Sequence, residues 1–458
     1  MEVTAPFDGT RIDTVETTGA AGVEEALATA HRIFRDRDSW LPTSRRIEIL
    51  RRVADSMREQ RESLALLAAR EGGKPLADSL VEVDRAVDGV HLCVDAMRAN
   101  AGYTVPMGIN AASQNRIART VPEPIGPVVA FSAFNHPLNL IVHQVGPAIA
   151  AGCPVIVKPA EATPLSCFRF VGMLHAAGLP KEWCRALVTD NLDTAGLLVA
   201  DERVGFFSFI GSARVGWMLR SRLAPGTRCA LEHGGAAPVI VEADADIDAA
   251  LPALGKGGFY HAGQVCVSVQ RVFAHRTIAR DLALRLAGLA AELRVGDPTD
   301  PATDVGPLIR PAEVARIHEW VSKSDGEVLC GGEPIGESCY RPTVLFDPSP
   351  DADVSREEIF GPVVCVYAYE HMNDAIARAN SLPYAFQASV FTRDLDASLR
   401  AARRLDAAAV MVNDHTAFRV DWMPFAGVRR SGLGVGGIEH TIRDMSIEKL
   451  IVIRSPEL

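Results

Sequence analysis

The chain has 458 residues, more than one ordinary hydrophobic core uses, so we expect two or three domains. Hydrophobic residues make up 48% and charged residues 23%, as in folded globular proteins, and this composition excludes disordered and collagen-like classes. The formal net charge of −10 disfavours the broad basic surface that nucleic-acid binding requires, so no nucleic-acid partner is expected.

The start of the chain and its cysteines bear on the compartment. Residues 1–9 lack the basic start and apolar stretch of a secretory signal, and no apolar run is long enough to cross a membrane. The nine cysteines show neither CxxC nor CxxxH spacing, which favours reduced thiols over disulfides or a metal site. We therefore expect a cytoplasmic protein with no membrane partner and no bound metal.

The pattern of apolar residues predicts an α/β protein. Residues 20–100 have helical spacing, as at Val23, Ala26, Leu27, Ala30 and Ile33. From residue 124 onward, short apolar runs alternate with helix-like segments, which predicts βαβ units on a parallel sheet. The expected strands there are 127–133, 154–157 and 204–209, with helices at 137–151 and 164–177.

A second α/β region follows from residue 237 to about residue 412. Its expected strands are 238–241, 363–367, 388–391 and 409–412. Residues 99–124, with polar and apolar alternation at 115–121, predict a hairpin, and residues 446–453 predict a C-terminal strand. Either of these two segments could pair outside the two main regions.

One cysteine lies in a segment suited to nucleophilic chemistry. Cys266 follows a Gly263-Gln264 turn, which would expose its sulfur to a substrate, and nearby backbone donors could lower the pKa of the thiol. This pattern alone is weak, because a free cysteine is more often a small buried apolar residue.

Two upstream segments supply polar groups of the kinds that such a nucleophile needs. Glu232 precedes Gly234 and Gly235, where the backbone can approach a ligand closely, and its carboxylate could act as a general base. Asn135 ends an expected strand, and its amide could donate a hydrogen bond to an oxyanion. Each residue also has a structural alternative, since such an Asn often caps a helix and such a Glu is often solvated.

Taken together, these segments resemble the aldehyde dehydrogenase superfamily, in which the 34-residue spacing from Glu232 to Cys266 is typical. The resemblance runs from about residue 5 to the C-terminus. It includes Lys158-Pro159-Ala160-Glu161, Val295-Gly296-Asp297-Pro298, Glu358-Ile359-Phe360-Gly361-Pro362 and Pro424-Phe425-Ala426-Gly427. The presence of Glu232 is typical of the hydrolytic, non-acylating branch of NAD(P)-dependent members.

The resemblance implies a role for each of the three central residues. Cys266 would attack the aldehyde carbon, and the Asn135 amide with the Cys266 backbone N–H would hold the oxyanion of the thiohemiacetal. After hydride transfer, Glu232 would activate water to hydrolyse the thioester and release a carboxylic acid. Two rivals stay open: a cysteine thiol esterase on the same fold, and a non-catalytic scaffold that retains it.

The resemblance also implies a dinucleotide site of a variant Rossmann type, since no GxGxxG is present. A helix opening at Gly211-Ser212 would receive the pyrophosphate. Lys158 and Glu161 would bind the adenine ribose, and the carboxylate would repel a 2′-phosphate, so NAD is preferred over NADP. The remaining cofactor positions implied are Phe134, Phe209, Val215, Gly234, Glu358 and Phe360.

The substrate side is expected to be polar. The resemblance places His136, Asn139, Leu140 and His143 along the substrate tunnel, with Arg419 and Phe425 near its end. The segment 418–421 is similar to that of lactaldehyde and phosphonoacetaldehyde dehydrogenase-like members. We expect a short, polar or anionic aldehyde whose far end is held by Arg419 or a protonated histidine.

The implied fold is an aldehyde dehydrogenase fold with three parts. Residues 1–98 and 125–231 would form the NAD-binding domain, and 232–424 a catalytic α/β domain. Residues 99–124 and 445–458 would form a small β oligomerisation element, and 425–444 would return to the cofactor domain. A strand given to a partner's sheet edge would make a homodimer or homotetramer. Some residues depart from the family pattern, notably His233 and His261, where Leu and Asn are commoner.

Overall fold

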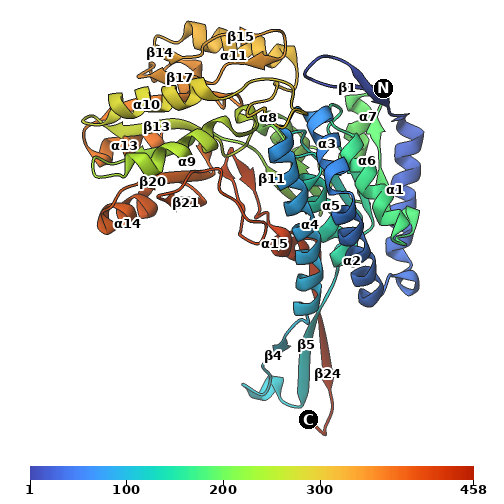
Figure 1. Cartoon of the computed structure of the whole chain (residues 1–458). Coiled ribbons are helices and arrows are strands. Elements are labelled where there is room, and N and C mark those ends of the chain that lie inside the picture. The colour runs from blue at the N-terminus through green and yellow to red at the C-terminus, as the bar shows by residue number, and fades with distance from the viewer.

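The computed structural model describes residues 1–458 as two large sheets with their covering helices and a third, small sheet that projects from the body (Figure 1). The α/β class expected from the sequence is confirmed, because both large sheets are parallel except for one edge strand each. No helix combines the length and the apolar character needed to cross a lipid bilayer.

The first sheet has the order β23-β11-β10-β6-β7-β8. Its strands are β6 (Val128–Phe131), β7 (Val155–Lys158), β8 (Cys184–Ala186), β10 (Phe206–Ile210), β11 (Arg228–Glu232) and the antiparallel β23 (Gly432–Leu433). Its helices are α1 (Ala20–Arg35), α2 (Thr43–Glu59), α3 (Arg61–Gly72), α4 (Leu76–Ala99), α5 (Asn139–Ala151), α6 (Leu165–Ala176), α7 (Leu192–Ala200), α8 (Ala213–Arg220) and α15 (Ile438–Asp444).

Helices cover both faces of this sheet because alternate strand residues point to opposite sides. Val128 and Ala130 of β6 pack in a core of 40 buried residues with α2, α4, α5 and α6. Val129 and Phe131 of the same strand pack in a second core of 16 residues with α1 and α7. The helical layer expected at residues 20–100 is thus split between the two faces.

The second sheet has the order β14-β17-β18-β13-β12-β20-β21 and one core of 42 buried residues. Its strands are β12 (Ala237–Val241), β13 (Val269–His275), β14 (Glu327–Cys330), β17 (Thr343–Phe346), β18 (Val363–Tyr369), β20 (Gln387–Phe391) and β21 (Ala409–Val412). Its helices are α9 (Ile247–Phe259), α10 (Ala279–Glu292), α11 (Pro311–Lys323), α12 (Asp353–Arg356), α13 (Met372–Ala379) and α14 (Leu395–Arg404).

The projecting sheet joins chain segments more than 300 residues apart. Its order is β24-β5-β4, all antiparallel, with β4 (Thr104–Val105), β5 (Arg116–Pro124) and β24 (Ser446–Arg454). The pairing of β5 with β24 runs from Ser446↔Pro124 to Arg454↔Arg116 without a bulge. Four two-stranded pairs complete the fold: β1 (Glu2–Thr4) with β2 (Arg11–Thr14), β3 (Thr17–Thr18) with β9 (Val188–Thr189), β15 (Pro334–Ile335) with β16 (Cys339–Tyr340), and β19 (Tyr384–Ala385) with β22 (Val428–Arg429).

A buried carboxylate fixes the start of α5, the helix that follows Asn135. Glu82 Oε1 accepts hydrogen bonds from the backbone N–H groups of Leu138 at 2.9 Å and Asn139 at 3.0 Å. Its other oxygen forms an ion pair with Lys74, and both side chains are fully buried. Glu71 caps α6 in the same way, through the N–H groups of Leu165 and Ser166. Helices α3 and α4 therefore hold the first turns of α5 and α6 through charge-assisted hydrogen bonds.

This arrangement predicts that Lys74→Met destabilises the protein strongly, by about 3–5 kcal/mol, because it leaves the Glu82 carboxylate buried without a cation. The double variant Lys74→Met/Glu82→Gln should recover part of that loss, since its buried amide is uncharged. Urea unfolding followed by circular dichroism measures both. Equal midpoints for the single and double variants would show that an unpaired charge on Glu82 is not what destabilises the single variant.

Candidate active site

The central predicted residues meet where the carboxyl ends of parallel strands face the loop between α9 and β13. Asn135 follows β6, Lys158 ends β7, Gly211 follows β10 and Glu232 ends β11. Since β10, β6 and β7 are adjacent and parallel, these residues share one edge of the first sheet. Cys266 lies in the loop that enters β13 of the second sheet. The site is therefore built between the two sheets, at the position where α/β folds usually bind ligands.

The loop that carries Cys266 has an unusual backbone. His261, Ala262 and Gly263 have φ angles of 49°, 54° and 67°, in the left-handed region that only glycine adopts without cost. A Cβ on Gly263 would lie 2.1 Å from the carbonyl oxygen of Gly361, so only glycine fits there. The Gln264 side chain accepts from Ile309 N–H at 2.9 Å and donates to the Pro307 carbonyl at 3.2 Å. These contacts hold the loop in its strained form.

Asn135 is bound directly to this loop. Its side-chain amide is buried and donates a hydrogen bond to the Gln264 carbonyl at 2.9 Å. That bond uses one of the two N–H groups of the amide and fixes the amide plane. The predicted oxyanion donor and the predicted nucleophile loop are thus held together across 129 residues of sequence.

Cys266 is partly exposed and packs against a small apolar cluster that includes Phe386 and Phe425. The pKa of its thiol is raised to about 12, chiefly by burial; the positive charge of Arg419 offsets part of the rise, and Glu232 and Glu358 add to it. The expectation that the loop lowers the pKa of this thiol is wrong for the protein without ligands. Withdrawal from water outweighs the backbone donors.

Glu232 lies at the end of β11 with its carboxylate turned toward Gly436. A Cβ at position 436 would lie 2.3 Å from Glu232 Oε1, so the side chain uses space that only a glycine leaves free. Burial raises the pKa of this carboxyl, and the charge of Arg419 opposes the rise. A carboxylate with a raised pKa near a substrate is suited to accept a proton at neutral pH.

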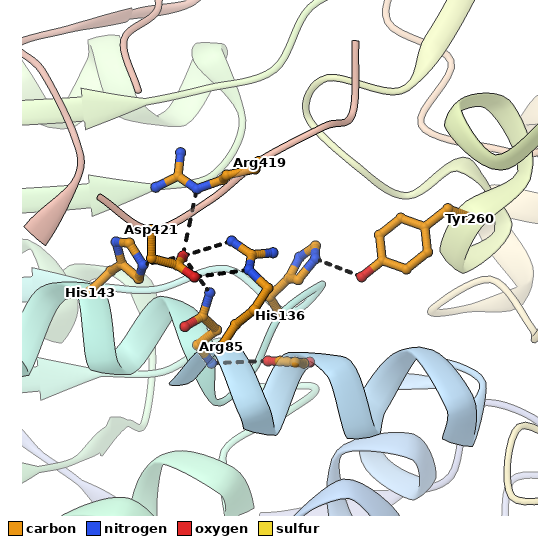
Figure 2. Close-up of polar contacts among 8 residues, drawn as sticks. Arg85, His136, His143, Tyr260, Arg419 and Asp421 are labelled. Atoms are coloured by element: carbon orange, nitrogen blue, oxygen red, sulfur yellow. Dashed lines mark hydrogen bonds and ion pairs between the residues drawn. The ribbon is translucent and has the colours of Figure 1, made fainter. Parts of the chain in front are cut away.

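The predicted substrate residues form a buried polar network (Figure 2). Asp421 accepts hydrogen bonds from both nitrogens of the Arg85 fork, at 2.7 and 3.0 Å, from His143 at 2.8 Å and from Asn139 at 3.3 Å. Arg419 lies 3.8 Å from the same carboxylate, and its guanidinium carbon lies 3.5 Å from the centroid of the Phe425 ring. Leu140 is half-buried in the first turn of α5.

The two histidines are not cationic at neutral pH. The pKa of His136 is far below its ordinary value because of burial and the charges of Lys74 and Arg85. Burial also lowers the pKa of His143, although Asp421 opposes this. His136 instead contacts the Tyr260 hydroxyl at 3.2 Å (Figure 2). These shifts disfavour a protonated histidine as the group that holds the substrate, which leaves Arg419 as the predicted cation.

Arg85 was not predicted from the sequence, and Asp421 was given no role. Arg85 lies on α4, 336 residues before its partner, within a helix whose pattern indicates only amphipathic packing. No local spacing could have paired these residues. The one available sign was a carboxylate two positions after Arg419.

The predicted cofactor residues form two groups. Lys158 pairs with Glu161 at 3.2 Å beside the Phe131 ring, and Ser212 precedes α8, which carries Val215, without using its hydroxyl to cap the helix. In the other group, Glu358 accepts from Gly235 N–H at 3.1 Å, and burial raises its pKa to about 8. A Cβ on Gly234 would lie 1.6 Å from that carboxylate. The rings of Phe134 and Phe360 meet edge to face at 5.8 Å.

His233, a departure from the family pattern, supports the start of α8. Its ring nitrogen Nδ1 lies 2.9 Å from the Gly211 carbonyl, and the ring packs against Phe209 and Trp217. A Cβ on Gly216 would approach this ring to 2.0 Å, so α8 can pack here only with glycine at that position.

The chain belongs to the aldehyde dehydrogenase family, whose model matches residues 1–451. It is 37% identical to a 3-sulfolactaldehyde dehydrogenase of Priestia megaterium, over 94% of this chain and 90% of that protein. Aldehyde dehydrogenase 21 of Physcomitrella patens, solved with the product succinate, superposes with a TM-score of 0.95 at 31% identity, covering 99% of this chain and 95% of that one. Glyceraldehyde-3-phosphate dehydrogenase of Methanocaldococcus jannaschii, solved with NADP, has a TM-score of 0.94 at 33% identity, covering 99% of each chain. The protein is thus an oxidoreductase that acts on aldehydes with a nicotinamide dinucleotide.

The raised thiol pKa predicts slow alkylation of Cys266 in the ligand-free protein. Its rate with iodoacetamide should keep increasing with pH beyond pH 10, because only the thiolate reacts. Arg419→Met should slow alkylation at every pH and shift the profile upward, whereas Arg419→Lys should retain much of the rate. Peptide mass spectrometry follows Cys266 and Cys229, a second partly exposed cysteine, in one sample. A plateau near pH 7 at Cys266 would contradict the prediction.

Proposed function

We propose that this family member oxidises a short polar or anionic aldehyde to its carboxylic acid through a thioester on Cys266. The observation that carries the proposal is that the Asn135 amide binds the loop of Cys266 while the charge of Glu232 acts on its thiol. A scaffold would have no need to place a half-buried Glu232 near a cysteine, since partial burial of a carboxylate costs free energy.

The chemistry follows from the positions of these groups. Cys266 sulfur attacks the carbonyl carbon, and the proton of the thiol passes to Glu232, because the thiol does not ionise by itself at neutral pH. The free N–H of Asn135 and the Cys266 backbone N–H stabilise the oxyanion. A nicotinamide bound on the Glu358 side of the site would supply the acceptor for the hydride that leaves the carbon. Glu232 releases its first proton to solvent and then takes a proton from water, whose oxygen attacks the thioester. The C–S bond breaks, the acid is released, and the proton held by Glu232 can return to the sulfur.

The residues of the cofactor groups fit NAD. Gly211 and Ser212 precede α8, whose first N–H groups and dipole suit a pyrophosphate. Phe209 and Val215 would lie beside the dinucleotide, with Gly234, Glu358, Phe134 and Phe360 on the nicotinamide side. We propose a preference for NAD over NADP because Glu161 pairs with Lys158, which cancels the cation that a 2′-phosphate would need.

Steady-state and burst kinetics test the mechanism. Cys266→Ala should lose NADH formation by at least about 1,000-fold. Glu232→Gln should slow turnover more than about 100-fold. The rate at which this variant forms NADH in the first turnover should exceed its later steady-state rate. Asn135→Ala should lower kcat by about 100-fold. Cys229→Ala, at another partly exposed cysteine, is the matched control and should keep wild-type activity.

Three outcomes would reject this proposal. Equal activity of the Cys266→Ala and Cys229→Ala variants would show that Cys266 is not the nucleophile. Cleavage of p-nitrophenyl acetate without any aldehyde oxidation would indicate the thiol esterase. Binding of NAD with neither activity, across short polar, anionic, aliphatic and aromatic aldehydes, would indicate the non-catalytic scaffold.

We also propose that the projecting sheet joins subunits as a homodimer or a dimer of dimers. Strand β24 is an open edge, and Leu450, Ile451, Val452 and Ile453 are each about half exposed. A nine-residue edge strand with a run of four apolar residues invites pairing with another sheet edge. Burial against a second copy would remove this surface from water.

Size-exclusion chromatography with light scattering tests the assembly. Ile451→Lys/Ile453→Lys should shift the protein to a smaller species, because the two lysines share one face of β24. Leu395→Lys/Leu399→Lys, on exposed apolar positions of α14, is the matched control and should leave the mass unchanged. A monomeric wild-type protein would refute the assembly.

The cysteines support a cytoplasmic location. All nine are free thiols, and none pairs with another in the fold. Free thiols in this number persist best in a reducing compartment.

A further inference from the structure

The network around Asp421 contains more positive charge than negative charge. Two guanidinium groups, Arg85 and Arg419, face the one carboxylate of Asp421, while His136 and His143 are neutral (Figure 2). Burial opposes ionisation of Asp421, but its hydrogen bonds with His143 and Arg85 hold the pKa of the carboxyl well below its ordinary value. Asp421 is therefore an anion at any working pH.

The negative charge of Asp421 is already paired with the positive charge of Arg85. The Arg85 fork binds it through two short bonds of 2.7 and 3.0 Å, the geometry in which a guanidinium and a carboxylate are best paired. The Asp421 carboxylate also accepts from His143 and Asn139, so its lone pairs are largely used. Arg419, at 3.8 Å, is outside hydrogen-bond distance.

The guanidinium of Arg419 has no hydrogen-bonded anion. Its Nη1 is buried and has no hydrogen-bond partner, and its guanidinium stacks on the Phe425 ring. The other carboxyl that acts on Arg419 is Glu232, which makes no hydrogen bond with it. Phe425 belongs to the apolar cluster that packs against Cys266. The Arg419 guanidinium therefore lies close to the cluster that surrounds the reacting sulfur. A buried guanidinium nitrogen without a partner costs free energy that a bound acceptor would restore.

We propose that the far end of the aldehyde substrate carries one negative charge, as a carboxylate or a sulfonate, which binds Arg419, and that Asp421 sets this number by cancelling the charge of Arg85. This inference rests on the proposed function and specifies its substrate class. Arg419 is then the specificity residue, and Asp421 is a positioning residue that acts through Arg85.

The same balance of charges around Arg419 disfavours other classes of substrate. A phosphonate dianion would bring a second charge that no free cation matches, because Arg85 is already paired. A neutral alkyl group would leave Arg419 Nη1 without a partner, and a quaternary ammonium group would add a second cation beside it. Sites with a dedicated polar group discriminate strongly against ligands that cannot use it.

Four aldehydes that differ only in the group on carbon 3 of propanal test the proposal: 4-oxobutanoate, 3-oxopropane-1-sulfonate, 3-oxopropylphosphonate and butanal. The pH is fixed at a value where the phosphonate carries two charges. We expect kcat/KM for the two monoanions to exceed that for butanal and for the dianion by about 10- to 100-fold. Equal values for butanal, or a preference for the dianion, would overturn the inference.

A charge series tests the role of Asp421. Asp421→Asn leaves two guanidinium groups without a carboxylate partner. It should raise kcat/KM for the phosphonate dianion relative to kcat/KM for the two monoanions. Arg85→Met leaves Asp421 to pair with Arg419 and should abolish the preference for monoanions over butanal. The double variant Arg85→Met/Asp421→Asn again has one free cation and should restore that preference. A purely structural role would lower kcat/KM for all four aldehydes together and would not restore the ratio in the double variant.

Failure of the inference is distinguishable from failure of the proposed function. NADH formation that requires Cys266, with no preference among the four aldehydes, rejects the inference alone. Protection of Cys266 from iodoacetamide needs no turnover, and propane-1-sulfonate should protect better than propylphosphonate or 1-propanol in the wild-type protein but not in Arg419→Met. Equal protection by all three compounds rejects the monoanion site, whether or not the protein turns over.

Discussion

The hydrogen bond from the Asn135 amide to the Gln264 carbonyl is the contact on which the site depends. It joins the carboxyl edge of the first sheet to the Cys266 loop of the second, and neither sheet contains a complete site without the other. Other contacts fix the backbone on both sides of this bond. Glu82 and Lys74 fix the start of α5 on one side, and Pro307, Ile309 and the Gly361 backbone fix the left-handed loop on the other. Such support is what allows a strained backbone to persist at a functional position.

Burial determines the electrostatics between the sheets. It raises the pKa values of the Cys266 thiol and of the carboxyl groups of Glu232 and Glu358. Arg419 opposes the rise for Cys266 and Glu232. The thiol therefore keeps its proton at neutral pH, and this proton must move when the sulfur attacks rather than before it.

The sequence predicted best where local pattern decides structure. Strand β21 was expected at the residues where it occurs, and the expected strands near β6, β7, β10, β12, β18 and β20 agree within a few residues, because buried parallel strands are apolar runs. Strand β13 was missed although it lies in the middle of its sheet. Its Gln270 and Arg271 interrupt the apolar pattern. Both are buried because they donate to the carbonyls of Val354 in α12 and Ala379 at the end of α13. The position of Cys266 was inferred from motif order, but the Arg85–Asp421 pair depends on tertiary contact, and the thiol pKa depends on burial that no motif records.

The position of Arg419 links substrate binding to the protonation of the nucleophile. Its charge stabilises both the Cys266 thiolate and the ionised form of Glu232, and it is also the cation that a substrate anion would bind. An anion bound there reduces the field of Arg419 at the sulfur, so the thiol becomes harder to ionise as the substrate arrives. The same anion raises the proton affinity of Glu232 for the same reason. Binding thus disfavours a free thiolate and favours direct transfer of the thiol proton to Glu232, so an anionic substrate would make the base more necessary and better suited to its task at the moment of attack.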